Sequence, residues 1–212
     1  MNLRDLYNAQ ARDQRDWNIL QDPHHHERAR RIIHHATRLL PPNGKLLDVG
    51  TGPADIPATI ARQRPDAEIH ATDIADEWIK EAKHRHGHLP NLHLQRADAR
   101  HLPYPDNTFH VTTCTEVLEH IPNWTRALHE LTRVTQPNGH LIITIPDDPE
   151  PDGTYHLHHL TPSTIKKHLP PTATLEHTEE IHDTDPRIPR VWLLTIRMTN
   201  RAQTERAPTR AP

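Results

Sequence analysis

Short apolar runs alternate along this chain with stretches whose apolar residues recur at helical spacing. Runs rich in Leu, Ile, Val and Thr that stop at an acid or a turn residue are typical of buried strands in a parallel sheet. Five such runs lie at Lys45–Val49, Ala67–Asp73, Leu92–Asp98, Phe109–Glu116 and Gly139–Asp147. The helical stretches between them are Ala54–Arg64, Asp76–His86 and Thr125–Val134. This alternation predicts a doubly wound α/β sheet whose ligand lies outside the carboxyl ends of the strands.

The segments that flank this core carry weaker signals. Apolar residues follow helical spacing in Glu27–Leu40, and Thr161–Leu169 begins like a capped helix with a proline in its first turn. Two final strands are predicted at Thr174–Asp183 and Arg190–Thr199.

The chain is short enough for one domain, which we expect over residues 1–200. The tail 201–212 has no apolar period, so we expect it to be disordered.

The turn after the first predicted strand is the main chemical signal. In KLLDVGTGPAD, Asp48 is followed by Gly50 and Gly52, which let the backbone turn sharply and come close to a ligand. The helix that follows directs its first N–H groups to the same place. Asp73 ends the second strand, where a carboxylate can accept hydrogen bonds from both ribose hydroxyls of an adenosine. The pattern predicts a nucleotide-binding corner.

The downstream motifs resemble those of the class I S-adenosylmethionine-dependent methyltransferases, especially the ubiquinone/menaquinone-type and type 11/12 small-molecule branch. The matching segments are LLDVGTGPAD, ATDIAD, RADARHLPYPDNTFHVTTCTEVLEHIPN and LTRVTQPNGHLIITIP, over roughly residues 24–200. The resemblance implies a Rossmann-like, mostly parallel seven-stranded sheet completed by an antiparallel C-terminal hairpin. It also implies that residues 1–40 form a helical lid and acceptor wall, where Tyr7 and Trp17 are the aromatic candidates.

The resemblance further implies S-adenosyl-L-methionine as the cofactor. Asp73 would bind the ribose, and Asp98 the adenine amino group with Ala99 donating its backbone N–H. Asp48 could instead only orient the glycine turn, and Asp98 could only cap the turn before Arg100. The full cofactor-binding set is Asp48, Gly50, Gly52, Asp73, Ile74, Asp98, Ala99 and Thr115. One departure from the family pattern is Ala54, where the family often has a third glycine. We expect this to weaken cofactor binding slightly and not to abolish it.

The candidate catalytic groups follow the fourth predicted strand. In a helical or turn segment Glu116, Glu119 and His120 would share one face, and His156 could approach from a later loop. We expect His120 to be a general base, because an imidazole titrates near neutral pH. Glu116 and His156 are the other catalytic candidates. His120 could also simply cap or hydrogen-bond this segment.

Glu116, Glu119, His120 and His156 have a second interpretation as ligands of a divalent metal ion. The small-RNA 2′-O-methyltransferases and some quinone-pathway O-methyltransferases look similar at this point. The same segment also occurs in many relatives as a mere helix start, and we favour a reaction without metal.

We therefore predict methyl transfer to an oxygen or nitrogen of a small molecule in a biosynthetic pathway. The alternatives are a metal-dependent RNA 2′-O-methyltransferase, an NAD-dependent oxidoreductase and a nucleotide-binding module without turnover. An NAD-dependent oxidoreductase of the short-chain type would need Tyr-x-x-x-Lys, but Tyr7, Tyr104 and Tyr155 are followed four residues later by Ala, Thr and His.

Composition narrows the setting. The formal charge of −3 gives no general attraction to nucleic acid, and no basic patch with interleaved aromatics is present. No run reaches the ~18 apolar residues of a membrane span, and the N-terminal stretch is too polar for a signal peptide. With a single cysteine, Cys114, we expect a cytoplasmic protein. Most of the 21 histidines are expected to face solvent.

Overall fold

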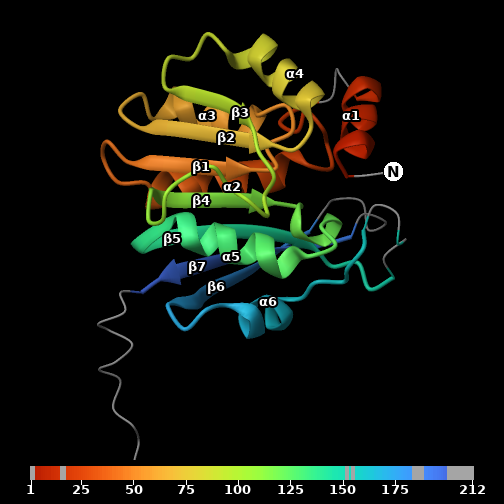
Figure 1. Ribbon diagram of the computed structural model, residues 1–212, viewed down its shortest axis with the longest axis vertical. Helices are drawn as coiled ribbons and strands as arrows, with labels where there is room; N and C mark the ends of the chain where they lie inside the picture. The colour runs from red at the N-terminus through yellow and green to blue at the C-terminus, as the bar shows by residue number, and fades with distance from the viewer. Residues whose placement is uncertain (1–2, 15–17, 151–152, 154–155, 183–188, 200–212) are drawn as a thin grey trace, which may run out of the picture.

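A seven-stranded mixed sheet forms the centre of the molecule (Figure 1). The computed structural model describes residues 3–14, 18–150, 153, 156–182 and 189–199. The sheet has the strand order β3-β2-β1-β4-β5-β7-β6, which is Rossmann-like and confirms the predicted doubly wound, seven-stranded fold class. Its strands are β1 Lys45–Val49, β2 Glu68–Asp73, β3 Leu92–Arg96, β4 Phe109–Thr115, β5 Thr135–Pro146, β6 Ala173–Ile181 and β7 Val191–Met198.

The strand order reverses between β1 and β4, which are parallel neighbours. Val49, the last residue of β1, lies opposite Thr72 of β2 and Cys114 of β4, so the carboxyl ends of these three strands meet at one edge of the sheet. A reversal of strand order opens a crevice at that edge, where ligands of such sheets bind. At the far side, β7 lies antiparallel between β5 and β6, which confirms the predicted C-terminal hairpin.

Helices cover both faces of the sheet. The helices α2 (His26–Leu39) and α3 (Asp55–Gln63) lie behind it in Figure 1, and α5 (Trp124–Val134) and α6 (Pro162–His168) lie in front. Neighbouring residues of β1 show why. Leu46 belongs to the core under α2 and α3, and Leu47 belongs to the core under α5 and α6, because successive side chains of a strand point to opposite faces. Both leucines are fully buried.

The N-terminal helix α1 (Leu3–Asp13) packs against α4 (Asp76–His86) near the carboxyl ends of the strands (Figure 1). Trp78 of α4 packs with Ala11 and Tyr7 of α1. The side-chain oxygen of Asn8 accepts a hydrogen bond of 3.0 Å from the backbone N–H of Glu77 in the first turn of α4. Residues 3–13 and 26–39 are therefore helical, and their action as a lid stays a prediction.

Most predicted elements agree with the structure to within a few residues, and β1 and α4 agree at both ends. The strand β5 begins four residues earlier than expected, at Thr135, because Gln136-Pro137-Asn138-Gly139 continues into the strand. Trp17 and the tail 201–212 lie outside the described residues. None of the described helices is both long and apolar enough to cross a membrane.

Candidate functional site

A cavity of about 560 Å³ opens at the carboxyl ends of β1, β2 and β4. Its walls come from the turn after β1, the ends of β2 and β4, and the helices α1 and α2. The described structure places all eight predicted cofactor-binding residues in its lining, namely Asp48, Gly50, Gly52, Asp73, Ile74, Asp98, Ala99 and Thr115. These eight residues come from four separate parts of the chain, which meet where the strand order reverses.

The two glycines of the turn have different surroundings. Both have a positive φ, 75° at Gly50 and 52° at Gly52, which favours glycine. A Cβ atom on Gly50 would overlap the side chain of Val117, whereas a Cβ atom on Gly52 would meet nothing within 4 Å. Gly50 is therefore required by packing within the protein, and Gly52 leaves open space on the cavity side.

Ala54 stands where the family often has a third glycine. Its φ is 63° and its side chain is fully buried at the start of α3. A left-handed conformation costs an ordinary L-residue about 1–2 kcal/mol. The departure from glycine thus leaves local backbone strain at the turn.

Asp73 holds the glycine turn in place from the end of β2. One carboxylate oxygen accepts a hydrogen bond of 2.9 Å from the backbone N–H of Gly52, and the other accepts one of 2.9 Å from Ala75. Burial raises the pKa of Asp73 to about 6, although these two hydrogen bonds oppose the rise. A buried carboxylate with few protein donors gains from further hydrogen-bond donors, such as hydroxyl groups.

Asp48 is buried at 3 % exposure, and it accepts a hydrogen bond from the hydroxyl of Thr113 on β4. Burial raises the pKa of Asp48, and the hydrogen bond from Thr113 opposes this rise. The side chain therefore links β1 to β4 beneath the turn while it also lines the cavity. Both interpretations of Asp48, as a turn-orienting group and as a ligand contact, agree with this position.

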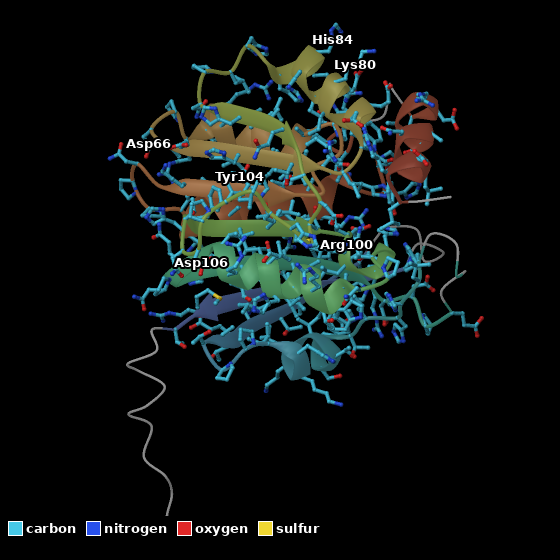
Figure 2. All side chains as sticks on the ribbon, viewed as in Figure 1. Asp66, Lys80, His84, Arg100, Tyr104 and Asp106 are labelled. Carbon is cyan, nitrogen blue, oxygen red and sulfur yellow. The ribbon has the colours of Figure 1, made fainter. Side chains whose placement is uncertain are left out.

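Asp98 also serves the protein's own structure. Its carboxylate accepts a hydrogen bond of 2.9 Å from the backbone N–H of Arg100 and one of 2.7 Å from Nη2 of the Arg100 side chain. These bonds hold the pKa of Asp98 below its usual value. Arg100 lies toward the carboxyl ends of the strands, and Asp66 and Asp106 lie toward the opposite edge (Figure 2). Asp98 thus caps this turn and lines the cavity beside Ala99.

The segment that carries the catalytic candidates is a short turn and not a regular helix. Residues Leu118–His120 form a single 3₁₀ turn, and Glu116 precedes it with a φ of 52°. Glu116 turns to α2, where its carboxylate forms an ion pair with Arg28. Glu119 is buried at 1 % exposure. Glu116 and His120 line the cavity, whereas Glu119 and His156 are absent from its lining.

Three of the four predicted metal ligands do come together. Glu119, His120 and His156 offer ligand atoms within 4.8 Å of one another, and the rings of His120 and His156 lie 5.0 Å apart. Neither carboxylate oxygen of Glu119 has a hydrogen-bond partner within the described part of the chain, and burial raises its pKa well above the usual value. A carboxylate and two imidazoles fit a divalent cation, and Nδ1 of His156 already contacts Asp148 at 2.7 Å.

Arg28 is a cavity residue that sequence reasoning missed. Its side chain is only 7 % exposed, and its Nε–H has no hydrogen-bond partner in the described structure. Tyr7, expected as an aromatic candidate, also lines the cavity, with its ring 5.8 Å from that of His120. Arg28 lies four residues before Ile32 on the apolar stripe of α2, and a cation on such a stripe is the signal that could have identified it.

Comparison with known proteins agrees with this geometry. Residues 47–143 match the family model described as a methyltransferase domain. The ubiquinone/menaquinone biosynthesis C-methyltransferase UbiE of Teredinibacter turnerae is 33% identical over 106 residues, which cover 48% of this chain and 43% of that protein. The chain spans less than half the length of the first curated relatives it matches.

Two solved structures share the fold. One is magnesium protoporphyrin IX methyltransferase (ChlM) from Synechocystis PCC 6803 with bound SAH, with a TM-score of 0.73, 16% identity, and coverage of 93% of this chain and 98% of that one. The other is the N-methyltransferase NodS from Bradyrhizobium japonicum WM9 with SAH, with a TM-score of 0.73, 14% identity, and coverage of 91% and 98%. Residues 47–143 thus form a class I S-adenosyl-L-methionine-dependent methyltransferase domain, and the chain has distant similarity to the UbiE-type enzymes.

Proposed function

We propose that this protein transfers the methyl group of S-adenosyl-L-methionine to an oxygen or nitrogen of a small molecule. The observation that carries the proposal is the composition of one cavity. The glycine turn, Asp73 and Asp98 line it together with His120, Arg28 and Tyr7. A cofactor-binding half and a polar half thus share a single space.

The cofactor half is assigned from the contacts of its residues. Asp73 would accept hydrogen bonds from the ribose hydroxyls, because its buried carboxylate now has two backbone donors. The open side of Gly52 would give room to the methionine part of the cofactor. Asp98 and the backbone N–H of Ala99 would bind the adenine, and Ile74 and Thr115 would complete the contact surface.

The polar half favours a methyl-accepting substrate with an oxygen or nitrogen atom that can accept a hydrogen bond. Arg28 contributes a buried Nε–H without a partner in the described structure, beside its ion pair with Glu116. A volume of about 560 Å³ is typical of sites for small molecules. The formal charge of −3 gives no support to a nucleic-acid substrate.

S-adenosyl-L-methionine supplies an electrophilic methyl group on a positively charged sulfur. The protein must align the acceptor with that methyl group, and alignment can supply ~7–11 kcal/mol of the barrier. We assign His120 as the general base that takes the acceptor's proton, because its imidazole lines the cavity. Glu116, held by Arg28, would position the acceptor, and His156 would orient His120 from behind.

The metal interpretation is now limited to Glu119, His120 and His156, which would hold the ion and bring a coordinated acceptor oxygen close to the cavity. We propose the base without metal. On this account, chelators leave activity unchanged and His120→Ala lowers turnover by ~10²–10⁴-fold. If a metal is essential instead, chelator abolishes activity, a divalent ion restores it, and Glu119→Ala is as damaging as His120→Ala.

The test of the proposed reaction is a screen of small-molecule extracts with the protein and S-adenosyl-L-methionine. We expect an acceptor that gains one CH₂ unit in mass, with equimolar S-adenosylhomocysteine. Relatives include enzymes named C- and N-methyltransferases, so the methylated atom is read from the product by NMR. A product methylated on carbon would refute the assignment of an oxygen or nitrogen acceptor, but it would still support S-adenosyl-L-methionine as the methyl donor.

A further inference from the structure

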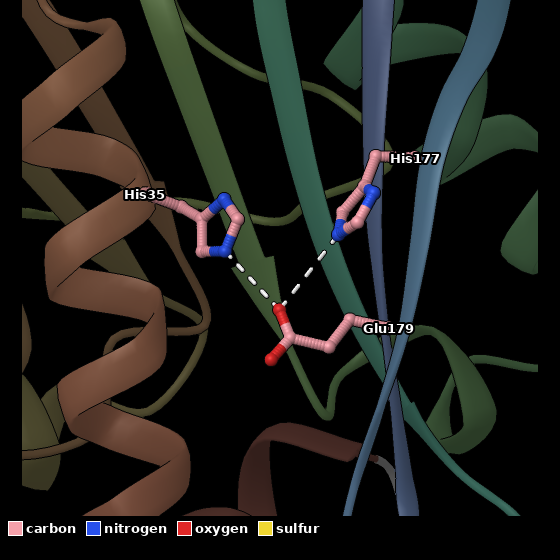
Figure 3. A group of neighbouring side chains, drawn as sticks. All are labelled: His35, His177 and Glu179. Carbon is pink, nitrogen blue, oxygen red and sulfur yellow. Dashed lines mark hydrogen bonds and ion pairs between the residues drawn. The ribbon is translucent and has the colours of Figure 1, made fainter.

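A group of two histidines and a glutamate lies away from the cavity, between α2 and the edge strand β6. His35 comes from α2, and His177 and Glu179 come from β6 (Figure 3). His177 and Glu179 are two residues apart on one strand, so their side chains point to the same face. None of the three lines the cavity described above.

Both imidazoles approach the same carboxylate oxygen. Nε2 of His35 lies 3.2 Å from Oε2 of Glu179, and Nε2 of His177 lies 3.8 Å from it (Figure 3). All three ligand atoms lie within 4.8 Å of one another. Ligand atoms in a tetrahedral zinc site, at 2.0–2.1 Å from the ion, lie about 3.3 Å apart. The two distances lie on either side of that value.

We propose that His35, His177 and Glu179 form a binding site for Zn²⁺ that joins α2 to β6. Two imidazole nitrogens and one carboxylate oxygen are ligands that zinc prefers, and a water molecule would take the fourth position. The three side chains are exposed to solvent by 24 %, 54 % and 19 %, so an ion can enter without unfolding.

Arg31 determines which oxygen of Glu179 faces the histidines. Its guanidinium forms an ion pair with Oε1 of Glu179 and another with Glu27, which leaves Oε2 toward the two imidazoles. Arg31 therefore orients the carboxylate, and its positive charge opposes the binding of a cation. It is a positioning residue and would not touch the metal.

The site has a structural consequence for α2. His35 lies seven residues after Arg28, about two helical turns along the same helix, and Arg28 is in the wall of the cavity. A metal bound to one side chain of α2 and two of β6 would fix the helix against the sheet. It would add to the ion pair of Arg31 with Glu179, which already joins these two elements.

Two other groups must be separated from this one in any experiment. Glu68, His70 and His93 also lie within reach of one ion, but Lys45 and His70 contact the two oxygens of Glu68 at 2.8 and 2.7 Å. The group of Glu119, His120 and His156 belongs to the cavity region. Zinc binding at the proposed site is therefore measured as the difference in binding between the wild type and variants of single groups.

The test is calorimetric titration of the metal-free protein with ZnCl₂ at neutral pH. We expect His35→Gln and His177→Gln each to bind one equivalent of zinc less than the wild type, or to bind that equivalent at least about tenfold more weakly. His34→Gln is the matched control, because this exposed neighbour on α2 belongs to none of the three groups, and it should bind zinc like the wild type. His93→Gln controls for the group on β2 and β3.

A second measurement is the melting temperature with and without Zn²⁺. Zinc should raise it in the wild type, in His34→Gln and in Arg31→Gln, and should raise it less in His35→Gln and His177→Gln. Circular dichroism of the metal-free variants checks that each has folded. The proposal is overturned if the wild type binds no zinc, or if His35→Gln and His177→Gln bind it as tightly and in the same number as His34→Gln.

Discussion

The two glycines of the turn look equivalent in the sequence, but the structure gives a different reason for each of them. Gly50 is needed because Val117 of the same chain occupies the place of a side chain. Gly52 is needed, on our account, because the cofactor would occupy that place. The two glycines therefore make different predictions for the same substitution.

We expect Gly50→Ala to destabilise the fold more than Gly52→Ala. Both substitutions strain a positive φ at about 1–2 kcal/mol, but only the methyl group at residue 50 would overlap Val117. Gly52→Ala should instead weaken the binding of S-adenosylhomocysteine. Urea denaturation and calorimetry measure the two effects. Equal losses of stability with unchanged binding in Gly52→Ala would contradict this division.

Asp73 gives the cofactor site a pH dependence. Its pKa of about 6 in the folded protein is above the usual value, so the Asp73 carboxylate takes up a proton as the pH falls through about 6. Ribose hydroxyls donate to the ionised carboxylate, so affinity for S-adenosylhomocysteine should fall as the pH falls below about 6. Asp73→Asn, which has no ionisable group there, should bind more weakly and with less pH dependence. A parallel pH profile for both proteins would contradict the assignment.

At the scale of helices and strands, the apolar periodicity predicted most elements to within a few residues, but it did not predict the conformation of the loops between them. The strand β1 matches at both ends because Gly44 and Gly50 bound it, and the helix α4 ends as predicted before Gly87. The sequence left Leu118–His120 open between a helix and a turn, because its residues fit both until tertiary contacts decide. The sequence motifs predicted that the cofactor-binding residues lie together, since all of them lie at or shortly after the carboxyl ends of strands. Arg28 could be placed in the cavity only once the packing of α2 on the sheet was known.

The pairing of α2 with the end of β4 should matter for the acceptor and not for the cofactor. We expect Arg28→Leu to lower kcat/KM for the acceptor at least about tenfold, because the buried guanidinium is lost. The affinity for S-adenosylhomocysteine should stay within about twofold. Arg30→Leu is the matched control on the same helix, where the exposed arginine pairs only with Glu27 among the described residues. If both variants behave alike, Arg28 has no specific role in the site.

At the scale of the whole molecule, histidines dominate the response to acid. Adding one charge for each of the 21 histidines to −3 would give +18, and self-repulsion destabilises a compact state. Burial lowers the pKa of His70 and of His140, so their contribution to stability is lost as the pH falls through the unfolded value of about 6.5. The raised pKa values of Asp48, Asp73 and Glu119 act in the opposite direction, because each carboxylate takes up a proton more readily in the folded state than in the unfolded chain.

We therefore expect the melting temperature to fall between about pH 7 and pH 5, because protonation of the 21 histidines makes the molecule strongly positive. His140→Gln should lose part of this fall, since it removes one half-buried ring with a lowered pKa. Differential scanning calorimetry over this range measures both proteins. A melting temperature that stays flat or rises as the pH falls would show that carboxylates dominate instead.

The central claim is that the cavity at the carboxyl ends of the strands binds S-adenosyl-L-methionine through Asp73. Calorimetric titration of the wild type and of Asp73→Ala with S-adenosylhomocysteine and with NAD tests it most directly. Two charge-assisted hydrogen bonds contribute ~1.5–3 kcal/mol each, so Asp73→Ala should weaken S-adenosylhomocysteine at least about tenfold. The account predicts that the wild type binds S-adenosylhomocysteine and prefers it to NAD. Tighter binding of NAD, or equal binding of S-adenosylhomocysteine by both proteins, would contradict it.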